Sequence, residues 1–290
     1  MAKQFPRAEV AGYSLPRVLI GTNWLLGWSH KSVSLDNMIT SRYDTAESFL
    51  PIFEAYLEYG IDAVMGPLSN HPVIADALNI VQDKLGAKLI YIDTPIINVD
   101  DTAAARGEAA AVIKKSKGIG AEFCLPHHSS VEQLVNKNKG IIERIDNYTT
   151  MIRDAGMIPG LSAHMPELVI YSDENGYDVE TYIQIYNCLG FLMQVEAEAV
   201  ASIIHKAKKP VMIIKPMAAG RTTPYVGLNF VWNTIRDRDM VTIGAHIPAE
   251  VHEDIEISFA ALERRYPNLE ARSSPNNKQA VLGKSVATIN

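Results

Sequence analysis

Histidines and a lysine stand at the ends of short apolar runs in this sequence. His127 and His128 follow AEFCLP, His164 follows MIPGLSA, Lys215 follows PVMII and His246 follows MVTIGA. Each run is followed by an amphipathic stretch, which is the alternation of a parallel α/β sheet. Because the carboxyl ends of parallel strands lie at one edge of the sheet, we expect these side chains to converge there.

Acid–base catalysis is the chemistry that these residue types favour. His127 and His128 are predicted to be catalytic because imidazole exchanges protons near neutral pH. Asp93 ends the run AKLIYID, and we expect its carboxylate to meet Lys215 across the mouth of the fold. That pairing would keep Lys215 charged, as a clamp for an anionic or carbonyl oxygen, whereas an isolated Lys215 would be a neutral nucleophile able to form a Schiff base. We predict the clamp.

A divalent metal is a second possibility at the same strand ends. Neutral imidazoles that converge on one mouth are ligands for such an ion, so His164 and His246 are candidate metal ligands, with Asp93 as an oxygen ligand. The sequence has no HxH or HExxH spacing, and a helix cap or a surface histidine is the alternative at each position.

Other polar and aromatic residues near strand ends are predicted to contact substrate. These are Asn23, Trp24, Tyr186 and Asn187. The remaining histidines lie in connector or helix patterns and are expected at the surface: His30, His71, His205 and His252.

Eight apolar runs alternate with helix patterns along most of the chain. The predicted strands are 17–28, 61–68, 87–95, 121–126, 157–164, 180–187, 210–217 and 240–246, and the predicted helices are 45–60, 71–86, 100–118, about 131–156, 195–209, 223–239 and 249–265. Residues 30–44 are interpreted as a polar connector. The pattern predicts an α/β fold with a single (β/α)8 TIM barrel over residues 17–265, because such barrels take roughly 250 residues. We expect residues 1–16 to form a hairpin cap, and residues 266–290 to form an irregular extension that is either a tail or an arm on a neighbouring copy in a homo-oligomer.

The composition indicates a globular chain with a small-molecule partner. Hydrophobic residues make up 47%, charged residues 21%, and the net charge is −6 with no basic run longer than a pair, so no nucleic-acid partner is predicted. Cys124 and Cys188 show no disulfide or CxxC spacing. No apolar stretch reaches the ~18 residues that a spanning helix needs, and the amino terminus does not resemble a signal peptide. We therefore expect a cytoplasmic protein without a membrane partner.

Several segments in order resemble the aldo-keto reductase superfamily, in particular its divergent branch. These are GYSLPRVLIGT, AEFCLPHH, IRDAGMIPGLSAHMPE, IQIYN, VMIIKPMAAG and IGAHIPAEVHEDIE. The resemblance implies a TIM barrel, a catalytic role for His127, and binding of NADP with Ser162 and Gln184 at the nicotinamide carboxamide and Arg221 at a phosphate. The Asp, Tyr and Lys that complete the reductases' catalytic set have no counterparts here, because VMGPLSN and Asp93-Thr94 stand in their places.

Three functions follow from these observations. The first is a TIM-barrel enzyme that acts on a small polar carbonyl, sugar or hydroxy-acid substrate by His/Asp/Lys acid–base chemistry, with metal assistance as an option. The second is an NAD(P)-dependent oxidoreductase in which other groups replace the missing tyrosine. The third is a non-catalytic metabolite-binding barrel, in which the strand-end histidines need not converge.

Overall fold

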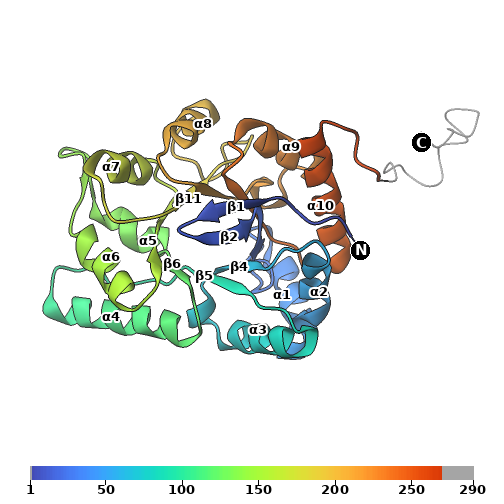
Figure 1. Ribbon diagram of the computed structural model, residues 1–290, viewed down its shortest axis with the longest axis horizontal. Coiled ribbons are helices and arrows are strands. Elements are labelled where there is room, and N and C mark those ends of the chain that lie inside the picture. Colours follow the sequence, from blue (N-terminus) through green and yellow to red (C-terminus); the bar gives the residue numbers. More distant parts are fainter. Residues whose placement is uncertain (1, 270–290) are drawn as a thin grey trace, which may run out of the picture.

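A closed barrel of parallel strands, surrounded by helices, forms the body of the protein (Figure 1). The computed structural model describes residues 2–269. The strands are β3 (Val18–Gly21), β4 (Ala63–Gly66), β5 (Ile90–Asp93), β6 (Phe123–Cys124), β9 (Ile158–Pro159), β10 (Leu161–Ala163), β11 (Tyr182–Ile185), β12 (Val211–Ile214) and β13 (Met240–Ile243). The helices are α1 (Val33–Arg42), α2 (Leu50–Leu57), α3 (Pro72–Leu85), α4 (Ala103–Gly118), α5 (His128–Val131), α6 (Ile145–Asp154), α7 (Glu167–Asn175), α8 (Ala197–Lys206), α9 (Pro224–Thr234) and α10 (Pro248–Glu263).

The barrel closes through one strand that is divided into two parts. β9 pairs with β6 and β10 pairs with β11, and only Gly160 separates the two parts. A Cβ atom on Gly160 would lie 2.7 Å from the Leu125 side chain and 2.7 Å from the carbonyl oxygen of Thr181, so a larger residue does not fit. β9 and β10 together are the fifth predicted strand, and the predicted TIM-barrel fold is confirmed.

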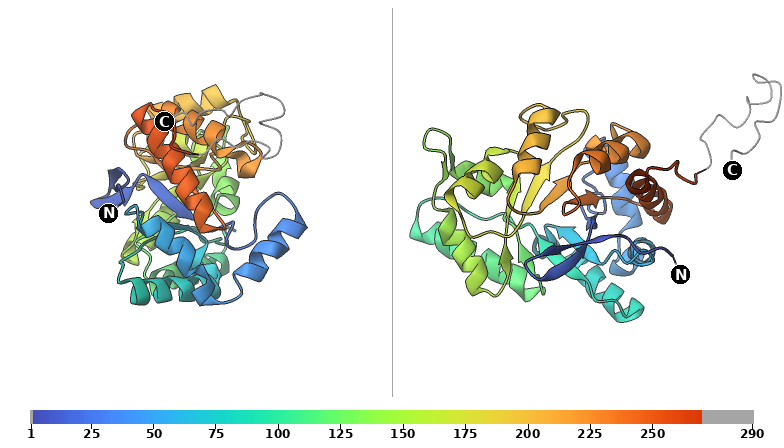
Figure 2. Two further views of the ribbon diagram at one scale, coloured as in Figure 1. Left: turned by 90° about the vertical axis from the view of Figure 1, so that its right-hand side faces the viewer. Right: turned by 45° about the horizontal axis from the view of Figure 1, so that its top comes forward.

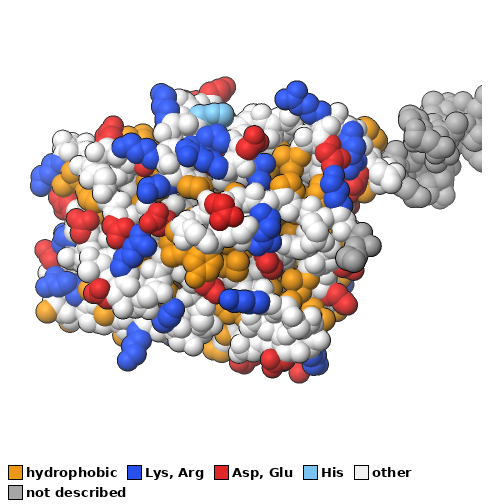
Figure 3. Space-filling model, viewed as in Figure 1, with side chains coloured by type: hydrophobic (Ala, Val, Ile, Leu, Met, Phe, Trp, Pro, Cys, Tyr) orange, Lys and Arg blue, Asp and Glu red, His pale blue; other side chains and the backbone are white. Residues whose placement is uncertain are grey.

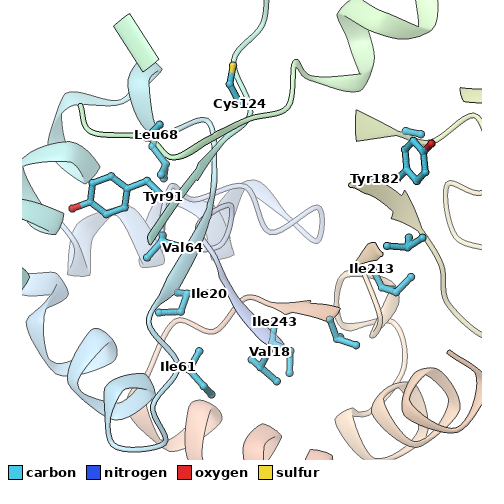
Figure 4. Close-up of a cluster of buried hydrophobic side chains, with 14 of the residues drawn as sticks. Val18, Ile20, Ile61, Val64, Leu68, Tyr91, Cys124, Tyr182, Ile213 and Ile243 are labelled. Atoms are coloured by element: carbon cyan, nitrogen blue, oxygen red, sulfur yellow. The ribbon is translucent and has the colours of Figure 1, made fainter. Parts of the chain in front are cut away.

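Side chains along each strand point alternately to the inside and the outside of the barrel, which gives two apolar layers. Leu19 faces the barrel interior, while its neighbours Val18 and Ile20 belong to the outer layer under the helices. Figure 4 shows this outer layer, with Ile20 beside Val64 of β4 and Val18 beside Ile243 of β13. Burying each such side chain contributes about 1.5–3 kcal/mol. The period of two also decides which polar residues reach the interior of the barrel.

A hairpin plugs the amino-terminal end of the barrel. β1 (Arg7–Val10) and β2 (Tyr13–Pro16) pair antiparallel, and their turn places Ala11 and Gly12 at positive φ, as two-residue hairpin turns require. Val10 and Leu15 are buried against inward side chains of the barrel strands. The predicted hairpin is confirmed, and in the left view of Figure 2 the hairpin and α1 lie at opposite ends of the barrel.

Two predictions about the connecting segments are wrong. The connector 30–44 contains α1, which begins where the Ser32 hydroxyl accepts a hydrogen bond from the Leu35 N–H. The helix predicted over 131–156 is instead α5, the 3₁₀ helix η3 (Glu132–Leu134), a hairpin of β7 (Val135–Asn136) and β8 (Ile141–Ile142), and α6. Gly140 has φ +64° in the turn of that hairpin, a conformation that interrupts a helix.

The surface carries both signs of charge. On the face that bears the hairpin, Lys and Arg side chains are interspersed with Asp and Glu (Figure 3). Within residues 2–269, none of the helices has the length and apolar character needed to span a bilayer. Most of the predicted extension 266–290 lies outside the described residues.

Candidate active site at the carboxyl end of the barrel

A large cavity opens at the end of the barrel opposite the hairpin. Its volume is about 750 Å³, within the range of small-molecule sites. Residues at or just after the carboxyl ends of seven barrel strands line it, among them Thr22, Gly66, Thr94, His127, His164 and Lys215. The residues that follow strands therefore form the walls, as in TIM-barrel enzymes.

Three imidazole rings lie against one another on one wall of the cavity. His128, at the start of α5, stacks on His164, which follows β10, with 3.8 Å between ring centroids and 13° between planes. The His127 ring lies 4.2 Å from His128. At this spacing the rings repel a second proton, because like charges in contact disfavour the charged form. We call these three residues the histidine stack.

Glu132 joins the histidine stack to the end of β10. Its Oε2 lies 3.5 Å from His128 Nδ1, and its Oε1 accepts hydrogen bonds from the backbone N–H groups of His164 and Met165. Burial alone would raise the pKa of Glu132, but the contact with His128 and the hydrogen bonds from these two N–H groups outweigh it and lower the pKa. Glu132 is thus a carboxylate that fixes two members of the stack, and its place within a presumed long helix concealed it in the sequence.

Burial keeps two of these rings neutral. Desolvation, assisted by the charges of His128 and Lys215, lowers the pKa of His127 to about 4 and that of His164 to about 3. Both rings are therefore unprotonated at neutral pH. The His127 Nδ1 also caps α5, accepting from the Ser129 N–H at 3.3 Å.

Lys215 reaches the cavity because the backbone turns at that residue. Met212 and Ile214 face the barrel interior, so strand alternation alone would direct Lys215 outward. Lys215 instead has φ +55°, and it lines the cavity beside Ile214. Burial lowers the pKa of the Lys215 ammonium, and within residues 2–269 no carboxylate forms an ion pair with it.

The expected pairing of Asp93 with Lys215 is not formed. Ile92 faces the barrel interior, so the next residue on β5 points outward, behind the cavity wall. Asp93 is buried there, and its Oδ1 accepts a hydrogen bond from the Ser69 N–H at 3.2 Å. Burial raises the pKa of Asp93, while the nearby Ser116 hydroxyl and the hydrogen bond from the Ser69 N–H oppose this. The clamp prediction is therefore wrong in its geometry, because it assumed that both strand ends point inward.

The candidate metal ligands have separate surroundings. His164 belongs to the histidine stack, whereas the His246 ring packs on Trp24 with 5.3 Å between centroids. His246 Nδ1 lies 2.8 Å from Glu250 Oε2, although the angle is not that of a hydrogen bond. In the part of the chain that the structure describes, no three His, Cys, Asp or Glu side chains come together as metal ligands.

Two of the three residues implicated in nicotinamide binding lie at the cavity. Ser162 and Arg221 line it, and the Arg221 guanidinium lies 3.8 Å from the centre of the Phe191 ring. Gln184 follows the inward Ile183, so its side chain points outward, and its Oε1 is buried without a hydrogen-bond partner among the described residues. The three therefore do not converge.

The predicted substrate-binding residues divide in the same way. Asn23 and Trp24 line the cavity. Tyr186 points outward, donating to Thr234 on α9 at 3.0 Å. Asn187 is buried, and its side chain accepts from the Phe191 N–H at 2.9 Å, so it shapes a loop.

Two histidines that were expected at the surface also line the cavity. These are His30 and His71, which bring the number of cavity histidines to five of the chain's eight. Burial, together with the charges of Lys215 and Arg221, lowers the pKa of His30. The ring of His71 lies edge-on to Trp28, 4.9 Å away. The signal was their place just after a predicted strand: His30 begins the connector 30–44 and His71 begins the predicted helix 71–86, and segments that follow strands form the mouth of a barrel.

Solved structures share this fold at low sequence identity. A putative aldo-keto reductase from Pseudomonas aeruginosa matches with TM-score 0.62 and 12% identity, over 89% of this chain and 94% of that one. An aldo/keto reductase from Klebsiella pneumoniae, solved with NADP and acetate, matches with TM-score 0.56 and 14% identity over 94% and 98%. Aldose reductase from Giardia lamblia matches with TM-score 0.51 and 12% identity over 96% and 92%. No protein-family model and no curated protein matches the sequence. These structures therefore share the TIM-barrel fold with this chain.

Proposed function

We propose that this protein is an enzyme that moves a proton on a small polar carbonyl, sugar or hydroxy-acid substrate. The observation that carries the proposal is the histidine stack, whose three rings line one cavity together with Lys215. Neutral imidazoles supply bases, and a lysine supplies an electrophile for the substrate oxygen. Convergence of these groups at one mouth favours an enzyme over a non-catalytic binding barrel.

Each residue has a role in this scheme. His127 or His164 accepts a proton from the carbon next to the carbonyl, because burial keeps both rings neutral. A charged Lys215 donates to the carbonyl oxygen, where negative charge develops. Glu132 lies 3.5 Å from His128 Nδ1 and positions that ring against His164. Asp93 takes no part, because its carboxyl group lies behind the wall.

Hydrogen–deuterium exchange tests this proposal without a known product. The protein is incubated in D₂O with pyruvate, glyceraldehyde, lactate and simple sugars, and loss of the proton next to the carbonyl or hydroxyl carbon is followed by ¹H NMR. We expect exchange with at least one carbonyl compound and a loss of about 10²-fold or more in His127→Asn. Asparagine is a good helix cap, so this variant keeps the start of α5.

His252→Asn is the matched control. His252 lies on α10, and its Nδ1 is 2.8 Å from the Tyr59 hydroxyl, outside the cavity. We expect exchange to be unchanged in this variant. Equal loss in both variants, or exchange that survives both in His127→Asn and in the parallel variant His164→Asn, contradicts the proposal.

A second candidate function is a nicotinamide-dependent oxidoreductase. It is favoured by a cavity of about 750 Å³ that includes Ser162 and Arg221. These two residues would hold the cofactor, which would supply hydride transfer. Because Trp24 and Trp28 also line the cavity, titration with NADPH should quench tryptophan fluorescence, and an unchanged signal at millimolar cofactor removes this candidate.

A further inference from the structure

The position of Lys215 distinguishes it from other basic side chains at the cavity. Lys31 and Arg221 also line the cavity, but Lys31 is exposed and an arginine cannot lose its proton. Lys215 is half-buried between apolar and imidazole neighbours. Among residues 2–269, Lys215 forms no ion pair with a carboxylate that would hold the amine in its charged form.

The backbone around Lys215 is strained in a way that directs this side chain inward. Lys215, Ala218 and Ala219 have φ values of +55°, +50° and +53°, a left-handed conformation that is unfavourable for residues other than glycine. Lys215 also precedes Pro216, and residues before proline prefer an extended conformation. Strain of this kind persists where a functional geometry requires it.

We propose that Lys215 is the nucleophile that binds a carbonyl substrate covalently, as an imine. The inference rests on the proposed function, because it takes the same cavity and the same carbonyl substrates, and it replaces the electrostatic role of Lys215 with a covalent one. The amine nitrogen attacks the carbonyl carbon, and the carbonyl oxygen takes up a proton from solvent to give a carbinolamine. That oxygen then leaves as water, and a protonated C=N bond remains.

The histidine stack supplies the proton transfers that these steps need. One ring takes the proton that the attacking nitrogen releases and returns it to the departing oxygen. A neutral ring then removes a proton from the carbon next to the C=N bond, and the electron pair moves onto the nitrogen to give an enamine. No metal, oxidant or reductant is needed for this sequence. The substrate class is a small aldehyde or ketone, including 2-keto acids, and the reactions that follow are aldol addition or cleavage and related carbon–carbon chemistry.

Borohydride trapping tests the inference directly. The full-length protein is treated with sodium borohydride in the presence of pyruvate, glyceraldehyde or acetaldehyde, and intact mass and peptide mapping locate the reduced adduct. We expect one adduct, at Lys215, together with irreversible loss of the deuterium exchange described above. The control is Lys215→Arg, which keeps the positive charge but has no nucleophilic amine, and we expect it to lose both adduct and exchange.

The outcomes separate this inference from the proposed function. Exchange that survives borohydride treatment, or that persists in Lys215→Arg, overturns the imine and leaves the proton-transfer function in place. An adduct at Lys215 without any exchange supports the imine and overturns the proton-transfer function. Neither exchange nor adduct with any compound overturns both, and an adduct spread over many lysines overturns the assignment to Lys215. Circular dichroism of Lys215→Arg verifies that the variant is folded.

Discussion

Replacing Lys215 with methionine should stabilise the protein while abolishing its activity. Methionine has a similar length and would occupy the same left-handed backbone conformation, so the strain at this position is unchanged and only the amine is removed. Burial lowers the pKa of Lys215, which means that folding disfavours the ammonium form. An unpartnered charged group costs about 1–3 kcal/mol or more when it is buried. Because Lys215 keeps some contact with solvent, we expect a gain of about 1–2 kcal/mol.

The pH dependence of this gain follows from the direction of the pKa shift. The folded-state pKa of Lys215 lies below the unfolded value of about 10.5, so between the two values the unfolded chain binds more protons. The stability of the wild-type protein relative to Lys215→Met therefore rises with pH in that window. The advantage of the variant should be largest at low and neutral pH and should disappear as pH approaches about 10.5.

Chemical denaturation followed by tryptophan fluorescence measures the difference in unfolding free energy at several pH values. At this chain length, each kcal/mol corresponds to about 2–4 °C in Tm, so thermal melts give an independent measure. A destabilised Lys215→Met, or an advantage that does not change with pH, would show that Lys215 has a structural partner and would refute the reasoning about its isolation.

Two further predictions test the surroundings of the site. His164→Phe keeps an aromatic ring stacked on His128 but removes the titrating group. The pKa of His164 is about 3 in the folded protein and about 6.5 in the unfolded chain. The wild type should therefore lose stability relative to this variant as pH falls from about 6.5 towards about 3. Parallel melts at pH 7 and pH 4.5 measure this, and equal losses in both proteins contradict the pKa. Asp93→Asn keeps an acceptor for the Ser69 N–H and should leave deuterium exchange unchanged, because Asp93 points away from the cavity. Its stability should exceed that of the wild type increasingly as pH rises above about 4, since burial raises the pKa of Asp93 and the folded state disfavours its charge. Lost exchange in Asp93→Asn would restore Asp93 as a catalytic candidate.

The sequence by itself determined the architecture of the barrel. The predicted strands are near-continuous apolar runs, such as AKLIYID and PVMII, because strands of a barrel are buried on both faces. Polar residues after these runs marked the end of the barrel that carries the cavity. The turn around Gly12 also predicted the hairpin at residues 7–16. These features depend on residues that are close in sequence, and local pattern is sufficient for them.

Only the tertiary structure decided which polar residues share the cavity. Asp93 and Lys215 both end apolar strands in the sequence, yet Asp93 points outward because Ile92 faces inward, and Lys215 points inward because its backbone turns at φ +55°. The direction of a side chain at a strand end depends on the phase of that strand within the barrel, and a shift of one residue reverses it. That phase is set by pairing with strands distant in sequence and by packing against the helices. The stacking of His128 on His164 has the same origin, since two segments 36 positions apart meet only after the barrel has closed.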